Sequence, residues 1–159
     1  MEPMPLVDPN HIHLVRVRLY KSNIEVNHKD EGLIQRIHHY SFSFNQKSYF
    51  DVEKKLVLLN LEILLVGKDD DNEFLDANGE FGIEFLFKID NLSSLSKTDT
   101  EGSFIVEESL GVTLMSIAYS TARGIILQST QSSMIEGVIL PVISPKDLLN
   151  DSSPTKEEE

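Results

Sequence analysis

Two stretches of this chain decide its fold: EKKLVLLNLEILLVG, residues 53–67, and EFGIEFLFKIDNL, residues 80–92. In each stretch every second residue is apolar, and this period of two is typical of a β-strand with one buried face. The apolar face of the first stretch consists of Val57, Leu59, Leu61, Ile63 and Leu65. The corresponding face of the second consists of Phe81, Ile83, Phe85, Phe87 and Ile89. The intervening KDDDNEFLDANGE, residues 68–80, is rich in Asp, Asn and Gly, so we expect an antiparallel pair whose apolar face must be covered.

Two further strands precede this pair. HIHLVRVRLYKSNIEVN, residues 11–27, places Val15, Val17 and Leu19 on one face, and a polar break after them predicts one long bent strand or two short ones. HHYSFSFNQKSYF, residues 38–50, alternates aromatic with polar residues. The aromatic face carries Tyr40, Phe42 and Phe44. The sequence therefore predicts a twisted antiparallel sheet of about four strands.

A long helix follows the polar linker SSLSKTDTEGS and extends from about residue 107 to residue 131. Acidic residues at its start suit the positive end of the helix dipole. At 100° per residue, one apolar stripe is formed by Leu110, Leu114, Ile117, Ala118, Thr121 and Ile125. A second stripe is formed by Val112, Met115, Tyr119, Ala122 and Ile126. The arc predicted to face water holds Ser116, Ser120 and Arg123.

Each of the two apolar stripes must pack against another apolar surface, and the sheet supplies one such surface. We expect a second subunit to supply the other. The alternative is a helix that is buried wholly within one monomer. Gly124 costs about 1 kcal/mol in a helix interior, which favours close approach of another backbone, with a simple kink as the alternative.

The C-terminal third ends in MIEGVILPVISPKDLLND, residues 134–151, an apolar extended piece followed by a short helix from Pro145 to Asn150 with Ser144 as its cap. The predicted fold class is α+β, a four-stranded antiparallel sheet backed by one long and one short C-terminal helix. We expect an irregular lead-in over residues 1–10, a single domain over residues 11–150 and an acidic disordered tail over residues 151–159.

Composition limits the possible functions. The chain has 159 residues, a net charge of -12 and no Cys, so it offers no disulfide framework or thiolate metal site, in keeping with a cytoplasmic location. The acidic balance disfavours nucleic acid as a partner. The N-terminal residues lack the pattern of a secretory signal, and the longest apolar run falls short of the roughly 20 residues of a membrane span, so we expect no membrane insertion.

No sequence motif marks a catalytic centre, and we expect no enzyme activity and no cofactor. The alternative is a metal-dependent enzyme, for which His11 and His13 would alternate on one strand face, with His28 or carboxylates as further ligands. Residues 68–80 resemble a calcium loop superficially, although a solvated turn is the better interpretation. Arg123 either holds a carboxylate or makes an ion pair on the helix surface, and we expect the ion pair.

Aromatic residues exceed what the sheet needs for its core. Some of them are predicted to line a groove for extended or unfolded apolar segments, with an acidic rim that keeps the protein soluble. The residues expected to contact such a client are Phe42, Phe44, Phe85, Phe87 and Tyr119.

The order of these elements resembles the SecB export-chaperone family and its SecB-like relatives. The first strand VRVRLYKSNIEV, the pair KKLVLLNLEILL and FGIEFLFKI, the helix SIAYSTARGIILQST and the segment GVILPVISPKDLL carry the resemblance, which covers residues 11–150. It implies a dimer of dimers with the long helix at the subunit interface. The interface residues would then be Leu114, Ile117, Ala118, Thr121 and Ile125.

The resemblance also implies a holdase that binds non-native chains without ATP and keeps them unfolded for export or protects them from aggregation. Export-type members dock the motor SecA through acidic residues, for which Glu25 and Glu84 are the candidates here. The segment KSNIEVN carries only one acidic residue, which departs from that pattern. The alternative is therefore a SecB-like chaperone dedicated to one partner, such as the antitoxin of a toxin–antitoxin system.

Overall fold

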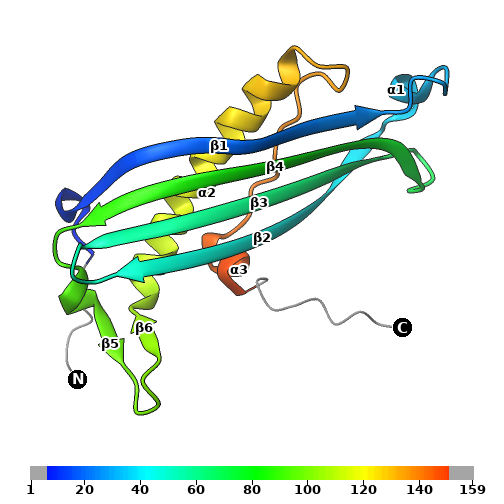
Figure 1. Cartoon of the computed structure of the whole chain (residues 1–159). Helices are drawn as coiled ribbons and strands as arrows, with labels where there is room; N and C mark the ends of the chain where they lie inside the picture. The colour runs from blue at the N-terminus through cyan, green and yellow to red at the C-terminus, as the bar shows by residue number, and fades with distance from the viewer. Residues whose placement is uncertain (1–6, 151–159) are drawn as a thin grey trace.

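The structure, a computed structural model, describes residues 7–150 and is built on one four-stranded antiparallel sheet (Figure 1). The strands follow the spatial order β1-β4-β3-β2. Their bounds are Ile12–Val26 for β1, His39–Asp51 for β2, Leu56–Lys68 for β3 and Phe74–Ile89 for β4. The helices are α1 (Leu33–Arg36), α2 (Glu108–Gln131) and α3 (Pro145–Asn150), with short 3₁₀ turns η1 (Pro9–His11) and η2 (Leu92–Leu95). The predicted fold class is confirmed, whereas residues 1–6 and 151–159 of the expected lead-in and tail lie outside the described residues.

The hairpin of β3 and β4 forms the centre of the sheet. Its register pairs Leu61 with Ile83, so the two predicted apolar faces coincide and are excluded from solvent. The turn is shorter than predicted because β4 already begins at Phe74. The Asp69 carboxylate closes this turn by accepting hydrogen bonds from the backbone N–H groups of Asp71 and Glu73, each at 3.0 Å.

β1 is one long strand with two bulges rather than two short strands. The bulges lie between Leu14 and Arg16 and between Leu19 and Lys21. The first bulge changes the register, so Leu14 rather than Val15 pairs with Phe87 on the helix-facing side. The prediction that Val15 shares a face with Val17 and Leu19 is therefore wrong, because a bulge changes the face to which the residues before it point.

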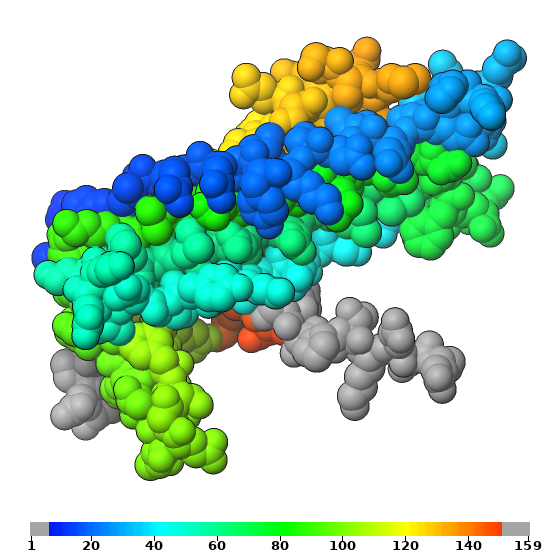
Figure 2. Space-filling model, viewed as in Figure 1, coloured from blue at the N-terminus to red at the C-terminus, as the bar shows by residue number. Residues whose placement is uncertain are grey.

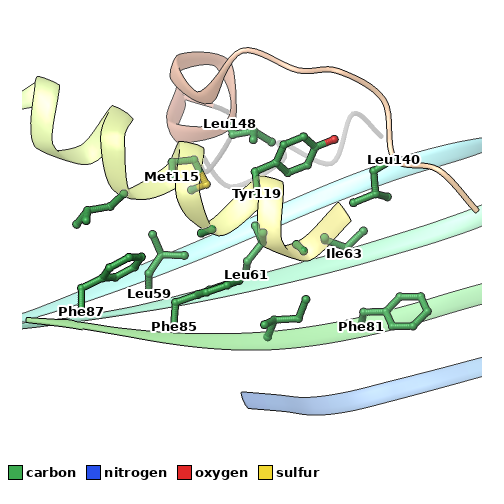
Figure 3. Packing of buried hydrophobic residues seen from close by; sticks show 14 of the residues in the cluster. Leu59, Leu61, Ile63, Phe81, Phe85, Phe87, Met115, Tyr119, Leu140 and Leu148 are labelled. Carbon is green, nitrogen blue, oxygen red and sulfur yellow. The ribbon is translucent and has the colours of Figure 1, made fainter. Parts of the chain in front are cut away.

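α2 lies behind the sheet in Figure 1 and buries a broad face. Its buried residues are Leu110, Leu114, Met115, Ala118, Tyr119, Ala122, Ile126 and Thr130. Figure 3 shows Met115 and Tyr119 of this face above the sheet residues Leu61 and Phe85. The buried face thus combines most of the two stripes that the sequence separates.

The second cover of α2 comes from the chain itself. The segment joining α2 to α3, residues 132–144 and here called the strap, runs back along the helix (Figure 1). The Thr130 hydroxyl accepts a hydrogen bond from the Val138 backbone N–H at 2.9 Å, and the Tyr119 hydroxyl donates to the Pro141 carbonyl. The stripe of Met115, Tyr119, Ala122 and Ile126 therefore needs no second subunit, contrary to expectation. Sequence periodicity does not show where an extended segment returns.

The segment expected to be a plain linker forms a small hairpin. β5 (Ser96–Thr98) pairs with β6 (Phe104–Val106), and the hairpin projects away from the sheet in Figure 1 and Figure 2. Within η2, Leu92 and Leu95 are buried in the core, which fixes the base of the hairpin.

Among residues 7–150, one helix, α2, is long and apolar enough to cross a membrane by its length and composition alone. The sequence analysis considered the longest apolar run, so it did not single out this helix. A core helix of a soluble protein meets the same criteria, and here the apolar face packs on the sheet and the strap.

Candidate functional site

Three aromatic side chains on the helix-facing side of β2 and one from α2 form a continuous series, and we call them the aromatic ladder: Tyr40, Phe42, Phe44 and Tyr119. The ring centroids of Tyr40 and Phe42 lie 6.4 Å apart, as do those of Phe42 and Phe44. The Phe44 ring meets Tyr119 of α2 edge-on at 5.8 Å, a favourable arrangement for aromatic pairs. The three rings of β2 are half-buried, so they retain accessible apolar surface.

The ladder lies at an edge of the sheet. β2 is the last strand in the order, and no described strand pairs with its outer side. In Figure 1 the strap passes behind the sheet, and α3 lies beyond β2. Three strap residues present apolar side chains to solvent: Met134 is 57% exposed, Ile139 65% and Val142 86%. Sequence analysis selected none of them. For Ile139, the signal is its alternation with buried Val138 and Leu140.

A groove continues from the ladder at its Tyr40 end. It has a volume of about 510 Å³ and lies between α1, the start of β2 and the strap. Its lining includes Ile34, Ile37, Tyr40, Met134 and Ile135, together with the polar residues Gln35, His38, His39 and Glu136. A groove of mixed apolar and polar lining beside an unpaired strand edge suits an extended polypeptide.

The other two aromatic residues predicted to contact a client are in the core. Phe85 and Phe87 of β4 are 0% exposed and stack on each other with centroids 6.5 Å apart. Figure 3 shows both rings in the cluster between the sheet and α2. They present no surface to a client in this conformation because the helix covers the centre of the sheet.

Tyr119 is 4% exposed, so it forms the floor of the ladder rather than its rim. Burial raises the pKa of its hydroxyl, and the positive charge of Arg123 partly offsets that shift. Burial also raises the pKa of Tyr40. Both hydroxyls therefore stay protonated well above neutral pH, and the ladder remains uncharged.

The residues predicted for the subunit interface divide into two groups. Leu114 and Ala118 are 2% and 0% exposed because the chain's own core covers them. Ile117, Thr121 and Ile125 are only half-buried, so they are the members of the stripe that retain surface for a partner.

The two glutamates considered for SecA differ in their surroundings. Glu84 lies on the outer face of the sheet and is 8% exposed. Its two carboxylate oxygens accept hydrogen bonds from Arg16 at 2.9 Å and Arg18 at 3.0 Å. Glu25 is exposed and accepts a hydrogen bond from the Asn23 amide at 3.3 Å. The carboxylate of Glu84 is therefore already neutralised by two guanidinium groups.

The residues of the metal-enzyme alternative serve other contacts. His13 lies 3.0 Å from the Asp90 carboxylate, and His11 lies 3.8 Å from it. Hydrogen bonding to His13 lowers the pKa of Asp90. Across residues 7–150 no group of three or more His, Cys, Asp or Glu side chains is arranged to hold a metal ion. In residues 68–80, which resemble a calcium loop, the Asp69 carboxylate accepts hydrogen bonds from the backbone of its own turn.

Comparisons with known proteins find no matching family model and no matching curated protein. The fold is similar to that of the Rv1957 SecB-like chaperone of Mycobacterium tuberculosis, solved in complex with a ChAD peptide from the HigA1 antitoxin. That likeness has a TM-score of 0.59 and 15% sequence identity, and it covers 85% of this chain and 92% of the other. A protein of unknown function from Streptococcus agalactiae matches with a TM-score of 0.43 and 10% identity, covering 82% and 97% of the two chains.

The chain therefore has a SecB-like fold, as its sequence predicts. At 15% identity the likeness concerns the fold, and function has to be argued from the site.

Proposed function

We propose that this protein is an ATP-independent holdase chaperone that binds extended, non-native polypeptide segments along the aromatic ladder. The observation that carries the proposal is the ladder itself, in which three half-buried rings of β2 lie beside an unpaired strand edge and a groove of mixed apolar and polar lining. Aromatic and aliphatic surface of this kind binds apolar side chains of many sequences, because apolar burial is non-directional. The bound peptide in the Rv1957 structure supports a peptide as the ligand of this fold.

The mechanism is mass action on the non-native state. A protein that binds only the unfolded form of a client lowers the free concentration of that form, and no bond is made or broken. The net charge of -12 keeps the chaperone soluble while its apolar edge is open, and it favours clients with basic flanks. The proposed location is the cytoplasm.

The test uses two substitutions on the same strand. Phe44→Ser removes a ring of the ladder, whereas Tyr49→Ser removes a ring that is 55% exposed on the opposite face of β2. The assay measures how strongly each variant slows the aggregation of a chemically denatured test protein. We expect Phe44→Ser to lose most of the protection and Tyr49→Ser to retain it. Equal protection by the two variants would contradict a client site on the ladder.

We also propose that the protein assembles as a dimer of dimers. Two surfaces support this. β1 is an edge strand of 15 residues whose helix-facing Leu14, Val17 and Leu19 are 40%, 37% and 38% exposed. Long edge strands with apolar side chains pair readily with another chain. The second surface is the half-buried stripe of α2, formed by Ile117, Thr121 and Ile125. Light scattering measures the mass of the assembly, and we expect a mass near that of four chains.

A dedicated partner is the second candidate, in place of a general role in export. The engagement of Glu84 by two arginines favours it, because a paired carboxylate has little charge left for a basic motor segment. We expect co-purification with one aggregation-prone partner such as an antitoxin and no measurable binding to SecA. Tight binding of SecA that Glu25→Gln abolishes would favour the export role instead.

A further inference from the structure

Arg123 differs from every other arginine of the chain. The chain has four arginines, two of which bind Glu84 while Arg36 binds Asp30. For Arg123, the part of the chain that the structure describes supplies no carboxylate within 4.0 Å, so the expected helix-surface ion pair is not formed within residues 7–150. Its Nε atom is shielded from solvent and has no hydrogen-bond acceptor. A half-buried guanidinium without a counter-ion is costly, because its desolvation is not offset by a partner.

The position of Arg123 associates it with the client edge. It lies one helical turn after Tyr119, so the two side chains share a face of α2. Its charge also acts on the Tyr119 hydroxyl, which donates to the strap at Pro141. On either side of Pro141 the strap exposes Ile139 and Val142. A cation and two exposed aliphatic side chains are thus grouped around the point where the strap meets the helix.

We propose that Arg123 binds a carboxylate of the client, so that the preferred client is an extended apolar segment carrying a single Asp or Glu. This inference rests on the proposed chaperone function. Arginine binds carboxylates through a planar fork of N–H donors, and the terminal Nη groups can meet a carboxylate side by side. The net charge of -12 repels strongly acidic chains, so Arg123 selects one acidic residue within an otherwise apolar or basic segment.

A client is a better occupant than a second copy of α2. The one acidic residue within this helix is Glu108, and its carboxylate is already paired with Lys146 at 3.0 Å. Two copies of α2 packed on each other would therefore bring no unpaired carboxylate to Arg123.

The test compares two synthetic peptides with the full chain. Each probe is a ten-residue fluorescent peptide of alternating Val, Ile and Ser with a Lys at each end. One peptide carries Asp at its centre and its twin carries Asn. Fluorescence anisotropy measures the two dissociation constants for the unaltered protein, for Arg123→Gln and for a matched control, Arg36→Gln. The control removes an exposed, paired arginine from α1.

We expect the unaltered protein and Arg36→Gln to bind the Asp peptide about tenfold more tightly than the Asn peptide, as one charge-assisted contact provides. Arg123→Gln should bind both peptides with the affinity of the Asn peptide. Equal binding of the twins by the unaltered protein, or discrimination that survives in Arg123→Gln, would overturn the inference and leave the chaperone function standing. Binding of neither peptide, with no protection against aggregation, would overturn both.

Two controls identify a different occupant. A change in light-scattering mass on Arg123→Gln would place Arg123 at a subunit contact and overturn the inference. A chain shortened to end at Asn150 tests the acidic residues 151–159. If this shortened chain bound the Asp peptide far more tightly, the chain's own acidic residues would be the occupant, again overturning the inference.

Discussion

The division of the aromatic residues between core and client edge leads to the most informative substitution, Phe85→Ala. The Phe85 side chain is 0% exposed and stacks on Phe87 beneath α2. Removing a fully buried ring loses its transfer free energy and leaves a cavity, which together cost about 3–5 kcal/mol. A domain of this size has a free energy of unfolding of about 5–15 kcal/mol, so the substitution removes a large share of it.

The matched substitution is Phe42→Ala on the edge strand. Phe42 is only half-buried, and the open edge allows its neighbours to adjust, so the expected loss is about 1–2 kcal/mol. Urea denaturation at one fixed protein concentration measures both values, because an oligomer's stability depends on concentration. Client affinity should show the opposite order. Phe42→Ala should bind the client more weakly than the unaltered protein, whereas the folded molecules of Phe85→Ala should bind it equally well. Equal stability losses, or a larger loss for Phe42→Ala, would refute the assignment of Phe85 to the core.

Three further substitutions test separate contacts. Glu84→Gln should lower the free energy of unfolding by about 1 kcal/mol, since it weakens two ion pairs whose arginines are largely exposed, and an unchanged urea midpoint would contradict this. Tyr119→Phe removes the hydrogen bond to Pro141 at a cost of about 1 kcal/mol, and amide hydrogen exchange should then become faster along the strap than in the sheet. The pKa of Asp90 is lowered chiefly by its hydrogen bond to His13, so this contact stabilises the fold above the ordinary pKa of Asp and is lost as the pH falls through the lowered value. His13→Ala should return the pKa of Asp90 toward its ordinary value in an NMR titration, and an unchanged pKa would show that the contact does not form.

Periodicity predicts most of this fold. The strands β3 and β4 follow from strict alternation, because most positions on the helix-facing side are buried in the core. α2 follows from its apolar stripes, and its predicted start differs from the observed one by a single residue. These elements are predictable because one long, regular pattern coincides with one buried surface.

The features that periodicity misses depend on local irregularity or on tertiary contacts. The bulge after Leu14 shifts the register of β1 without altering its composition. The hairpin of β5 and β6 has strands of three residues, too short for an alternation to be visible. The strap covers α2 without forming a helix or strand, and its role depends on where an extended segment returns in space.

The candidate site is harder to predict than the fold for the same reason. On its strand, Phe42 has the same alternating context as Phe85 has on β4, and only the position of the strand in the sheet separates them. β2 is an edge strand and β4 is an inner strand, which leaves Phe42 half-buried and Phe85 inaccessible. Strand order is a tertiary property, so sequence analysis names both residues as client contacts and does not distinguish them.

The measurement that tests the central claim most directly is the aggregation of a chemically denatured test protein, followed by light scattering without nucleotide at increasing ratios of this protein. A holdase should suppress aggregation stoichiometrically, with protection complete near one assembled oligomer per client and no gain on adding ATP. An unchanged aggregation rate at a large molar excess of this protein, together with a light-scattering mass of one chain, would contradict the proposed chaperone function.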